Sequence, residues 1–95
     1  MAQKRSLYVV AYDIPSDKRR SKVHKTLCGF GKWTQYSLFE VFLDDKELVL
    51  LQNRLEAILN PKQDSLRFYP LCQNCIEKVE TVGSKPPEEA QVYVL

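Results

Sequence analysis

An aspartate lies at the end of the first apolar segment of the chain. Residues 7–14 read LYVVAYDI, and Asp13 is the only charged residue in this run. A carboxylate that ends an apolar strand is costly to bury unless something stabilises its charge. Two interpretations are open: an acceptor in a turn or helix cap over residues 13–16, or a ligand for a hard divalent cation such as Mg²⁺. One aspartate per chain is few for a metal site, and a symmetric dimer would supply a second copy.

A dense basic segment follows this strand end. Residues 18–25 read KRRSKVHK and include Arg19, Arg20, Lys22 and Lys25. Basic side chains in the first turns of a helix oppose the helix dipole, so folding gives no reason for them there. The phosphates of a nucleic acid do give a reason, because Lys and Arg neutralise backbone charge. We therefore expect this helix to bind nucleic acid or another polyanion, the alternative being a merely solvated helix face.

Three other features give weaker signals. His24, the only histidine, is expected to face solvent on its helix. Cys72 and Cys75 have CxxC spacing without a second ligand pair, so we expect loop cysteines without a role, and zinc shared across a dimer stays open. Most aromatic residues fall at strand positions typical of a core. Trp33, which follows Lys32, is the aromatic residue that we expect to stack on bases.

The composition is that of one small globular domain. Of its 95 residues, 44% are hydrophobic and 27% are charged, and its three cysteines do not form an even disulfide framework. The chain has no apolar run as long as a membrane span and no cleavable signal pattern, so we expect a cytoplasmic protein. Residues 1–32 carry a net charge of +6, and the remainder carries −4. Such polarity can attract a polyanion to one face.

Hydrophobic periodicity and turn residues predict the elements that position these side chains. We expect a strand over 7–14, a helix from Ser16–Asp17 to Gly29, a bent strand or hairpin over 33–43 that turns near 35–37, a helix from Asp44 to Asn60, strands over 66–71 and 76–82, and a strand-like tail over 92–95. Asp44 followed by Glu47 resembles a capping box for the second helix. This order predicts an α+β fold, a ferredoxin-like βαββαβ sandwich with an extra strand.

Four segments resemble a known family in both sequence and order. They are Tyr12-Asp13-Ile14, the basic Arg19-Arg20-x-Lys22, the segment from Gln35 to Glu40, and the segment from Asp64 to Leu71. Together they are similar to the CRISPR-associated protein two family over about residues 7–71. The resemblance implies a metal-dependent endoribonuclease or endonuclease. It also implies a ferredoxin-like homodimer whose two sheets face each other.

The resemblance assigns roles to individual positions. Asp13 matches the catalytic, metal-binding aspartate, paired across the dimer axis, and Mg²⁺ or Mn²⁺ is the implied cofactor. Arg20 and Lys22 match basic positions that handle nucleic acid, and Tyr12 and Phe39 fall at aromatic positions of the family motifs. Many members have arginine where this chain has Trp33. A phosphate contact at that position is therefore either replaced by stacking or lost.

The resemblance also suggests how the chain is divided. Residues 1–82 would form the ferredoxin-like domain. Residues 83–95 would form a linker and a C-terminal strand that pairs with the partner protomer. Such a strand would cover a sheet edge that is otherwise prone to unwanted pairing.

Three hypotheses for the function follow. The first is a Mg²⁺-dependent phosphodiesterase acting on RNA or DNA in CRISPR spacer acquisition and antiviral defence, with Arg19, Arg20 and Lys22 positioning the strand. The second is a non-catalytic, DNA-binding dimeric scaffold for the CRISPR-associated integrase, which is the implied protein partner. The third is a toxin-like ribonuclease outside any CRISPR locus.

Overall fold

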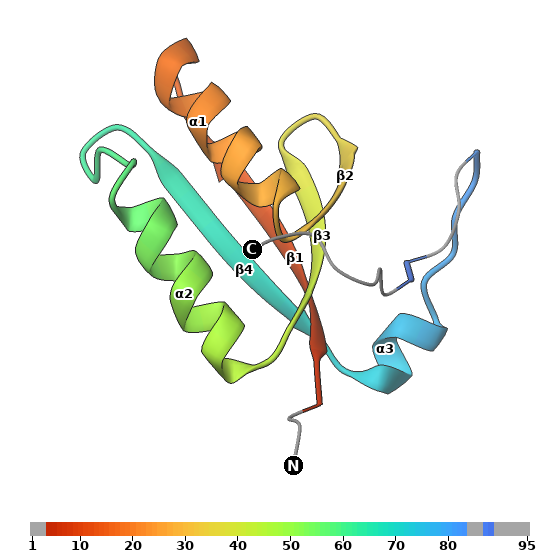
Figure 1. Cartoon of the computed structure of the whole chain (residues 1–95). Helices are drawn as coiled ribbons and strands as arrows, with labels where there is room; N and C mark the ends of the chain where they lie inside the picture. Colours follow the sequence, from red (N-terminus) through yellow and green to blue (C-terminus); the bar gives the residue numbers. More distant parts are fainter. Residues whose placement is uncertain (1–3, 84–86, 89–95) are drawn as a thin grey trace.

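Figure 1 shows the computed structural model of the chain, in which two helices pack against a four-stranded sheet. The structure describes residues 4–83 and 87–88. Its elements are β1 (Ser6–Asp13), α1 (Asp17–Cys28), β2 (Gly31–Gln35), β3 (Leu38–Leu43), α2 (Asp45–Glu56), β4 (Ser65–Leu71) and α3 (Gln73–Glu77). The strand order is β2-β3-β1-β4, and neighbouring strands are antiparallel. This is the ferredoxin-like arrangement, so the predicted fold class is confirmed.

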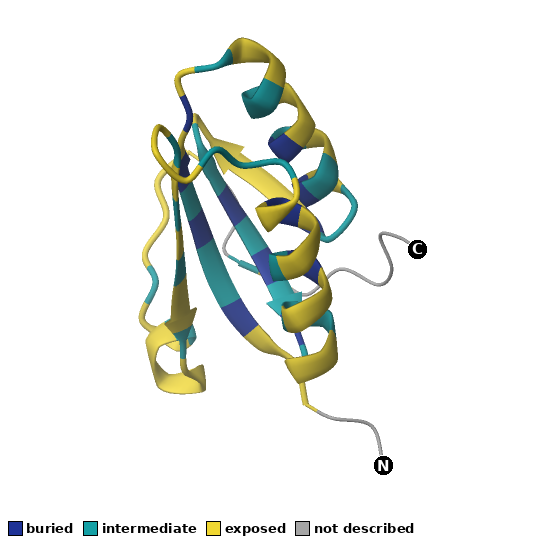
Figure 2. Cartoon of the chain, turned by 90° about the vertical axis from the view of Figure 1, so that its left-hand side faces the viewer, coloured by how far each residue is buried: buried dark blue, intermediate teal, exposed yellow. Residues whose placement is uncertain are grey.

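The core lies between the sheet and the helices α1 and α2 (Figure 2). Alternation along β1 turns Val10 and Tyr12 toward the helices, where both are buried. The helices contribute Val23, Leu27, Leu51 and Leu55, all fully buried. By the same alternation Asp13 belongs to the face of the sheet opposite the two helices. The alternation of side chains along β1 therefore places the core residues and the Asp13 carboxylate on opposite faces of the sheet.

The predicted caps form as expected. The Ser16 hydroxyl accepts the backbone N–H of Arg19 at 3.2 Å and begins α1. Asp44 and Glu47 form a complete capping box, with reciprocal hydrogen bonds of 2.8 and 2.9 Å. The second helix ends at Glu56, four residues before the predicted end. The chain then turns, and its next apolar residues still pack against the core.

The segment over 33–43 contains a hairpin rather than a bent strand. The chain turns at Tyr36 and Ser37, between β2 and β3. β2 begins at Gly31, where an added Cβ would lie only 2.3 Å from the Glu40 carbonyl oxygen. Glycine is therefore required for the close approach of the two strands.

The prediction of a strand over 76–82 was wrong. The chain forms the short helix α3 instead, followed by irregular structure over 78–82. Ile76 and Val79 are half-buried and lie three residues apart, which is the spacing of a helical turn rather than the alternation of a strand. Cys72 is the N-terminal cap residue of α3, so the CxxC motif joins a strand to a helix and not two strands.

Two further observations concern the limits of the fold. The predicted strand-like tail over 92–95 lies outside the described residues. Within the described part of the chain, every helix is too short and too polar to cross a membrane.

Candidate nucleic-acid and metal site at the end of strand β1

Asp13 is the last residue of β1, and its side chain is exposed. It pairs in register with Ser65, the first residue of β4. Within residues 4–83 and 87–88, no group forms a hydrogen bond or ion pair with its carboxylate. The helix cap belongs to Ser16, not to Asp13. The interpretation of Asp13 as a cap or turn acceptor therefore has no support in the structure, and its oxygens are accessible to a ligand.

Arg20 lies against the loop that follows this carboxylate. Its Nη1 donates to the carbonyl oxygen of Ile14 at 2.8 Å, and its Nη2 pairs with Asp17 one turn earlier. The carbonyl belongs to the residue directly after Asp13, so the guanidinium is held at the loop that leaves the end of β1. The side chain is still 42% exposed. Arg20 therefore presents positive charge to solvent next to the end of β1.

Arg19 points to a different part of the molecule. Its Nε donates to Asp64 Oδ2 at 2.7 Å, and its Nη2 donates to Asp64 Oδ1 at 3.0 Å and to Gln63 Oε1 at 3.0 Å. The Asp64 side chain is fully buried and also accepts the backbone N–H of Asn60 at 2.8 Å. The hydrogen bonds from Arg19 hold the pKa of Asp64 below its usual value. Arg19 thus clamps α1 to the loop before β4.

The sequence analysis missed the partner of this clamp. Asp64 was noted only as part of a family-like segment. The sequence did contain a feature that points to this role. Asp64 lies just before a predicted strand and follows Asn60 by four residues, which suits a carboxylate that closes a loop. What the sequence could not supply was the partner, which is 45 residues away.

The remaining cations of α1 face solvent. Lys18, Lys22 and Lys25 are all exposed and lie on the helix that follows Asp13. The structure therefore places Arg20, Lys22 and Lys25 on an accessible surface and draws Arg19 into a half-buried contact. Lys22 and Lys25 remain available for the phosphate contacts predicted from the sequence.

Tyr12 and Phe39 support the strand end from within the core. Both are buried, and their ring centroids are 6.3 Å apart. The Tyr12 hydroxyl lies 3.4 Å from His24 Nδ1, and burial raises the pKa of this hydroxyl above its usual value. These two aromatic residues therefore position β1 and β3 and do not reach the surface where a ligand would bind.

The expectation that His24 faces solvent was wrong. The ring is half-buried and packs edge-on against Phe39, with centroids 5.1 Å apart, and against Trp33, with centroids 6.4 Å apart. The polar character of histidine indicated solvent, but the ring packs on the aromatic residues of the sheet beneath α1. His24 thus links the basic helix to the β2–β3 hairpin.

Trp33 is partly exposed in β2, three residues before the turn residue Tyr36. Its side chain is 54% accessible, and its Nε1 donates to the carbonyl oxygen of Tyr36 at 2.7 Å. The sequence analysis did not select Tyr36, which is 87% exposed. The sequence feature that could have identified Tyr36 is its position in the predicted turn, where core packing does not explain an aromatic residue.

Cys72 and Cys75 lie together at the junction of β4 and α3. Their sulfur atoms are 3.4 Å apart, and both residues are exposed. Hydrogen bonds from Cys75 lower the pKa of the Cys72 thiol, and the same interaction raises the pKa of the Cys75 thiol. No cluster of three or more His, Cys, Asp or Glu side chains occurs in the described part of the chain. These residues alone therefore do not complete a zinc site.

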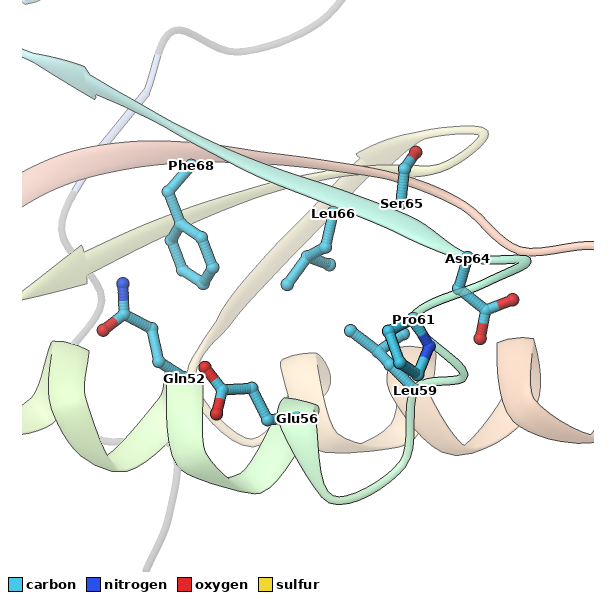
Figure 3. Close-up of a pocket in the computed structure, with 8 residues that line it drawn as sticks. All are labelled: Gln52, Glu56, Leu59, Pro61, Asp64, Ser65, Leu66 and Phe68. Atoms are coloured by element: carbon cyan, nitrogen blue, oxygen red, sulfur yellow. The ribbon is translucent and has the colours of Figure 1, made fainter.

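A groove of about 760 Å³ runs between α2 and β4 (Figure 3). Its lining consists of Gln52, Glu56, Leu59, Pro61, Asp64, Ser65, Leu66 and Phe68. The Asp64 carboxylate in its wall is already bound by Arg19. The groove thus offers mainly apolar surface, and its other carboxylate, Glu56, belongs to α2.

Comparison with known proteins identifies the family. The family model described as "CRISPR associated protein Cas2" matches residues 6–79. The CRISPR-associated endoribonuclease Cas2 3 of Synechocystis sp. is 46% identical over 80 residues, which cover 84% of this chain and 87% of that protein. The CRISPR-associated endonuclease Cas2 2 of Thermus thermophilus is 43% identical over 90 residues, which cover 94% of this chain and 96% of that protein.

Solved structures agree with this assignment. The crystal structure of Streptococcus pyogenes Cas2 at pH 6.5 has a TM-score of 0.72 at 35% identity, covering 81% of this chain and 99% of that chain. A chain of a partial Cas6-RT-Cas1–Cas2 complex has a TM-score of 0.74, covering 95% of this chain and 98% of its own, and at 23% identity it shows the fold alone. The chain described here belongs to the Cas2 family of CRISPR-associated proteins. The family suggested by the sequence motifs is confirmed.

Proposed function

We propose that the protein is a metal-dependent nuclease that cleaves RNA or DNA at a site formed by paired Asp13 residues, and that it acts in CRISPR spacer acquisition and antiviral defence. The observation that carries this proposal is an exposed carboxylate at the end of an apolar strand, without a partner among the described residues. The names of the relatives, endoribonuclease and endonuclease, support the class of reaction.

The chemistry of Asp13 suits a hard cation. Mg²⁺ takes oxygen ligands, keeps several waters, and often needs only one or two protein carboxylates. A single chain lacks a larger acidic cluster among its described residues, so one protomer would hold the ion weakly. Mg²⁺ or Mn²⁺ held by the Asp13 residues of two protomers would supply an acidified water and charge stabilisation at the scissile phosphate.

The other residues of the site bind and orient the strand. Arg20, fixed to the Ile14 carbonyl, is placed to contact a phosphate oxygen beside Asp13. Lys22 and Lys25, exposed on α1, neutralise the charge of flanking phosphates. Arg19 acts indirectly, because its clamp to Asp64 holds α1 in place.

A homodimer completes this site. Asp13 belongs to the sheet face opposite α1 and α2, so stacking two sheets by that face can bring the two carboxylates toward a common axis. β4 forms an edge of the sheet, the kind of edge that an added strand covers. Pairing of residues 92–95 with the partner stays a prediction, as does a location in the cytoplasm.

The direct test is the substitution Asp13→Asn. We expect cleavage of RNA or single-stranded DNA oligonucleotides by the purified protein with Mg²⁺ or Mn²⁺ to fall on the order of 100-fold or more. Asp45→Asn makes the same charge change at the start of α2, at the other end of the sheet, and should cleave like wild type. Full metal-dependent cleavage by the Asp13→Asn protein would falsify the proposal.

Mixed dimers test whether both carboxylates are needed. Wild-type protein is unfolded and refolded with increasing amounts of the Asp13→Asn variant, so that subunits exchange. If two Asp13 side chains share one cation, activity falls with the square of the wild-type fraction. A linear fall would show that each protomer works alone and would exclude the shared site.

A second function is favoured by a different observation. The basic face of α1 is accessible whether or not Asp13 binds a metal, which suits a dimeric DNA-binding scaffold for the integrase. One similar fold occurs in a complex that contains Cas1. Spacer acquisition in cells separates the two functions. The scaffold predicts normal acquisition with Asp13→Asn and loss with Arg20→Glu combined with Lys22→Glu, whereas an essential nuclease predicts loss with either.

A further inference from the structure

We propose that Tyr36 and Trp33 form a stacking platform for an unpaired base of the nucleic-acid strand whose phosphate lies at Asp13 and Arg20. This inference rests on the proposed binding of nucleic acid and names the form of the ligand, a single strand or a flipped-out base. It assigns a function to a residue, Tyr36, that the rest of the site does not use.

The backbone at Tyr36 has a conformation that disfavours this residue. Its φ is +46°, in the left-handed region. Bulky L-residues rarely adopt this region, and the first position of a two-residue hairpin turn with positive φ favours glycine. Local folding therefore gives no reason for a tyrosine here.

Packing gives no reason either. The Tyr36 side chain is 87% exposed, so burial contributes little to its presence. Trp33, close by, is 54% exposed. Tyr36 thus lies at a hairpin turn where neither the backbone nor the core requires a large aromatic side chain, and partly exposed Trp33 lies three residues before it in β2. A residue in a strained backbone conformation is often associated with a functional site.

Hydrogen bonds fix the shape of the tip. Trp33 Nε1 donates to the Tyr36 carbonyl oxygen at 2.7 Å, and the Thr34 hydroxyl donates to the Leu38 carbonyl oxygen at 3.1 Å. Trp33 also packs against His24 of α1. The turn backbone and Trp33 are therefore held in place before a ligand arrives, which reduces the ordering cost of binding.

The tip lies at the same end of the sheet as Asp13 (Figure 1). The backbone N–H of Tyr12 donates to the Ser37 carbonyl oxygen at 3.1 Å, which joins the turn to the residue before Asp13. Arg20 Nη1 of α1 donates to the carbonyl oxygen of Ile14, the residue after Asp13, at 2.8 Å. The hairpin turn and the loop bound by Arg20 therefore both lie at the strand end that carries Asp13, whose side chain belongs to the other face of the sheet.

This combination favours an unpaired base as the occupant. Exposed aromatic rings beside cations form the usual platform for single-stranded nucleic acid, because each base offers a π-face to the rings and each phosphate a charge to the cations. In a duplex the bases are stacked and paired, so their faces are not accessible to Tyr36.

The chain contains a built-in reporter. Trp33 is the only tryptophan, so the intrinsic tryptophan fluorescence arises from the platform itself. We expect a single-stranded oligonucleotide, added without divalent cation so that it stays intact, to quench this emission. A duplex of the same sequence and a single strand with abasic sites throughout should quench it much less. Equal quenching by the abasic strand would overturn the proposal, since that strand offers phosphates without bases.

Substitutions at Tyr36 test the platform further. Tyr36→Gly removes the ring and suits the positive φ, so the protein should fold with an unchanged or higher Tm. We expect its affinity for the single strand to fall about 10-fold. Tyr36→Phe retains the ring and should bind like wild type. An unchanged affinity of Tyr36→Gly for the single strand would overturn the proposal. The proposal would also be overturned if this variant bound the single strand like wild type and lost only its binding to a purified protein partner.

The platform and the nuclease fail in different ways. Quenching that persists while no cleavage occurs supports the platform and removes the nuclease. Cleavage that depends on Asp13 but proceeds equally with Tyr36→Gly, without quenching, supports the nuclease and removes the platform.

Discussion

Asp13 and Asp64 lie at the same end of the sheet, yet their surroundings are opposite. Asp13 pairs in register with Ser65, the residue after Asp64, so the two carboxylates are on neighbouring strand ends. Consecutive arginines of α1 are near them. Arg19 binds Asp64 through two hydrogen bonds, whereas Arg20 binds the loop after Asp13 and leaves its carboxylate without a contact.

Solvent exposure explains why the two carboxylates differ. Asp64 is fully buried, and a buried charge requires a charged partner and hydrogen bonds. Asp13 is exposed and keeps its hydration without a protein partner. The same chemical group therefore stabilises the fold at one strand end and remains available to a ligand at the other. The difference teaches that a carboxylate which the fold does not use remains accessible to a ligand.

Stability should separate the two carboxylates most clearly. Asp64→Ala leaves the Arg19 guanidinium and the Asn60 N–H without their acceptor, so we expect the Tm to fall by about 5–10 °C. The matched change Asp13→Ala removes an exposed group and should shift the Tm by less than about 2 °C. Thermal unfolding followed by circular dichroism gives both values. Equal shifts in the two variants would contradict the contrast.

The two arginines should divide binding from stability. Arg20→Ala removes one phosphate contact, so we expect the affinity for nucleic acid to fall by about 3- to 10-fold. The slope of log affinity against log salt concentration should decrease by about one, because one fewer counterion is released. Arg19→Ala should lower the Tm and leave the affinity of the folded protein and its salt slope unchanged. Fluorescence anisotropy with a labelled oligonucleotide over a series of salt concentrations measures both. A larger loss of affinity in Arg19→Ala would show that the clamp also contacts the strand.

Acid should weaken the Asp64 clamp. Arg19 lowers the pKa of Asp64 in the folded protein below its ordinary value of about 3.8. The clamp therefore adds stability above that value and loses it as the pH falls through the lower, folded-state pKa. We expect the wild-type Tm to drop, as the pH is lowered from about 5 to well below 3.8, by a few degrees more than the Tm of Asp64→Ala. Parallel curves for the two proteins would show that the clamp is not linked to this titration.

Much of the fold was predictable because its signals are local. The capping box of Asp44 and Glu47, the Ser16 cap and the alternation along β1 depend on residues within one or two turns of each other. Such patterns act through neighbouring backbone groups, and tertiary contacts seldom override them when several agree. The hairpin at residues 36–37 was anticipated for the same reason, as one of two open alternatives.

The errors arose where local signals were weak or ambiguous. Residues 76–82 alternate well enough for a strand, but Ile76 lies in α3, and residues 78–82 form neither helix nor strand. His24 looked like a solvent-facing residue of a basic helix, and only the structure shows that its ring packs on Phe39. A side chain that can be polar or apolar takes its role from the surface beneath it.

For the candidate site, too, some features follow from the local sequence and others only from the tertiary structure. The sequence by itself determined that a carboxylate ends the first strand and that a basic helix follows it, because both features lie within one short stretch of chain. Only the tertiary structure decided that Arg19 serves Asp64, that Arg20 binds the loop after Asp13, and that Tyr36 is displayed at the same strand end. Those outcomes depend on contacts between residues far apart in the chain, such as the 45 that separate Arg19 from Asp64. Such contacts form only when the sheet closes, so no local pattern encodes them.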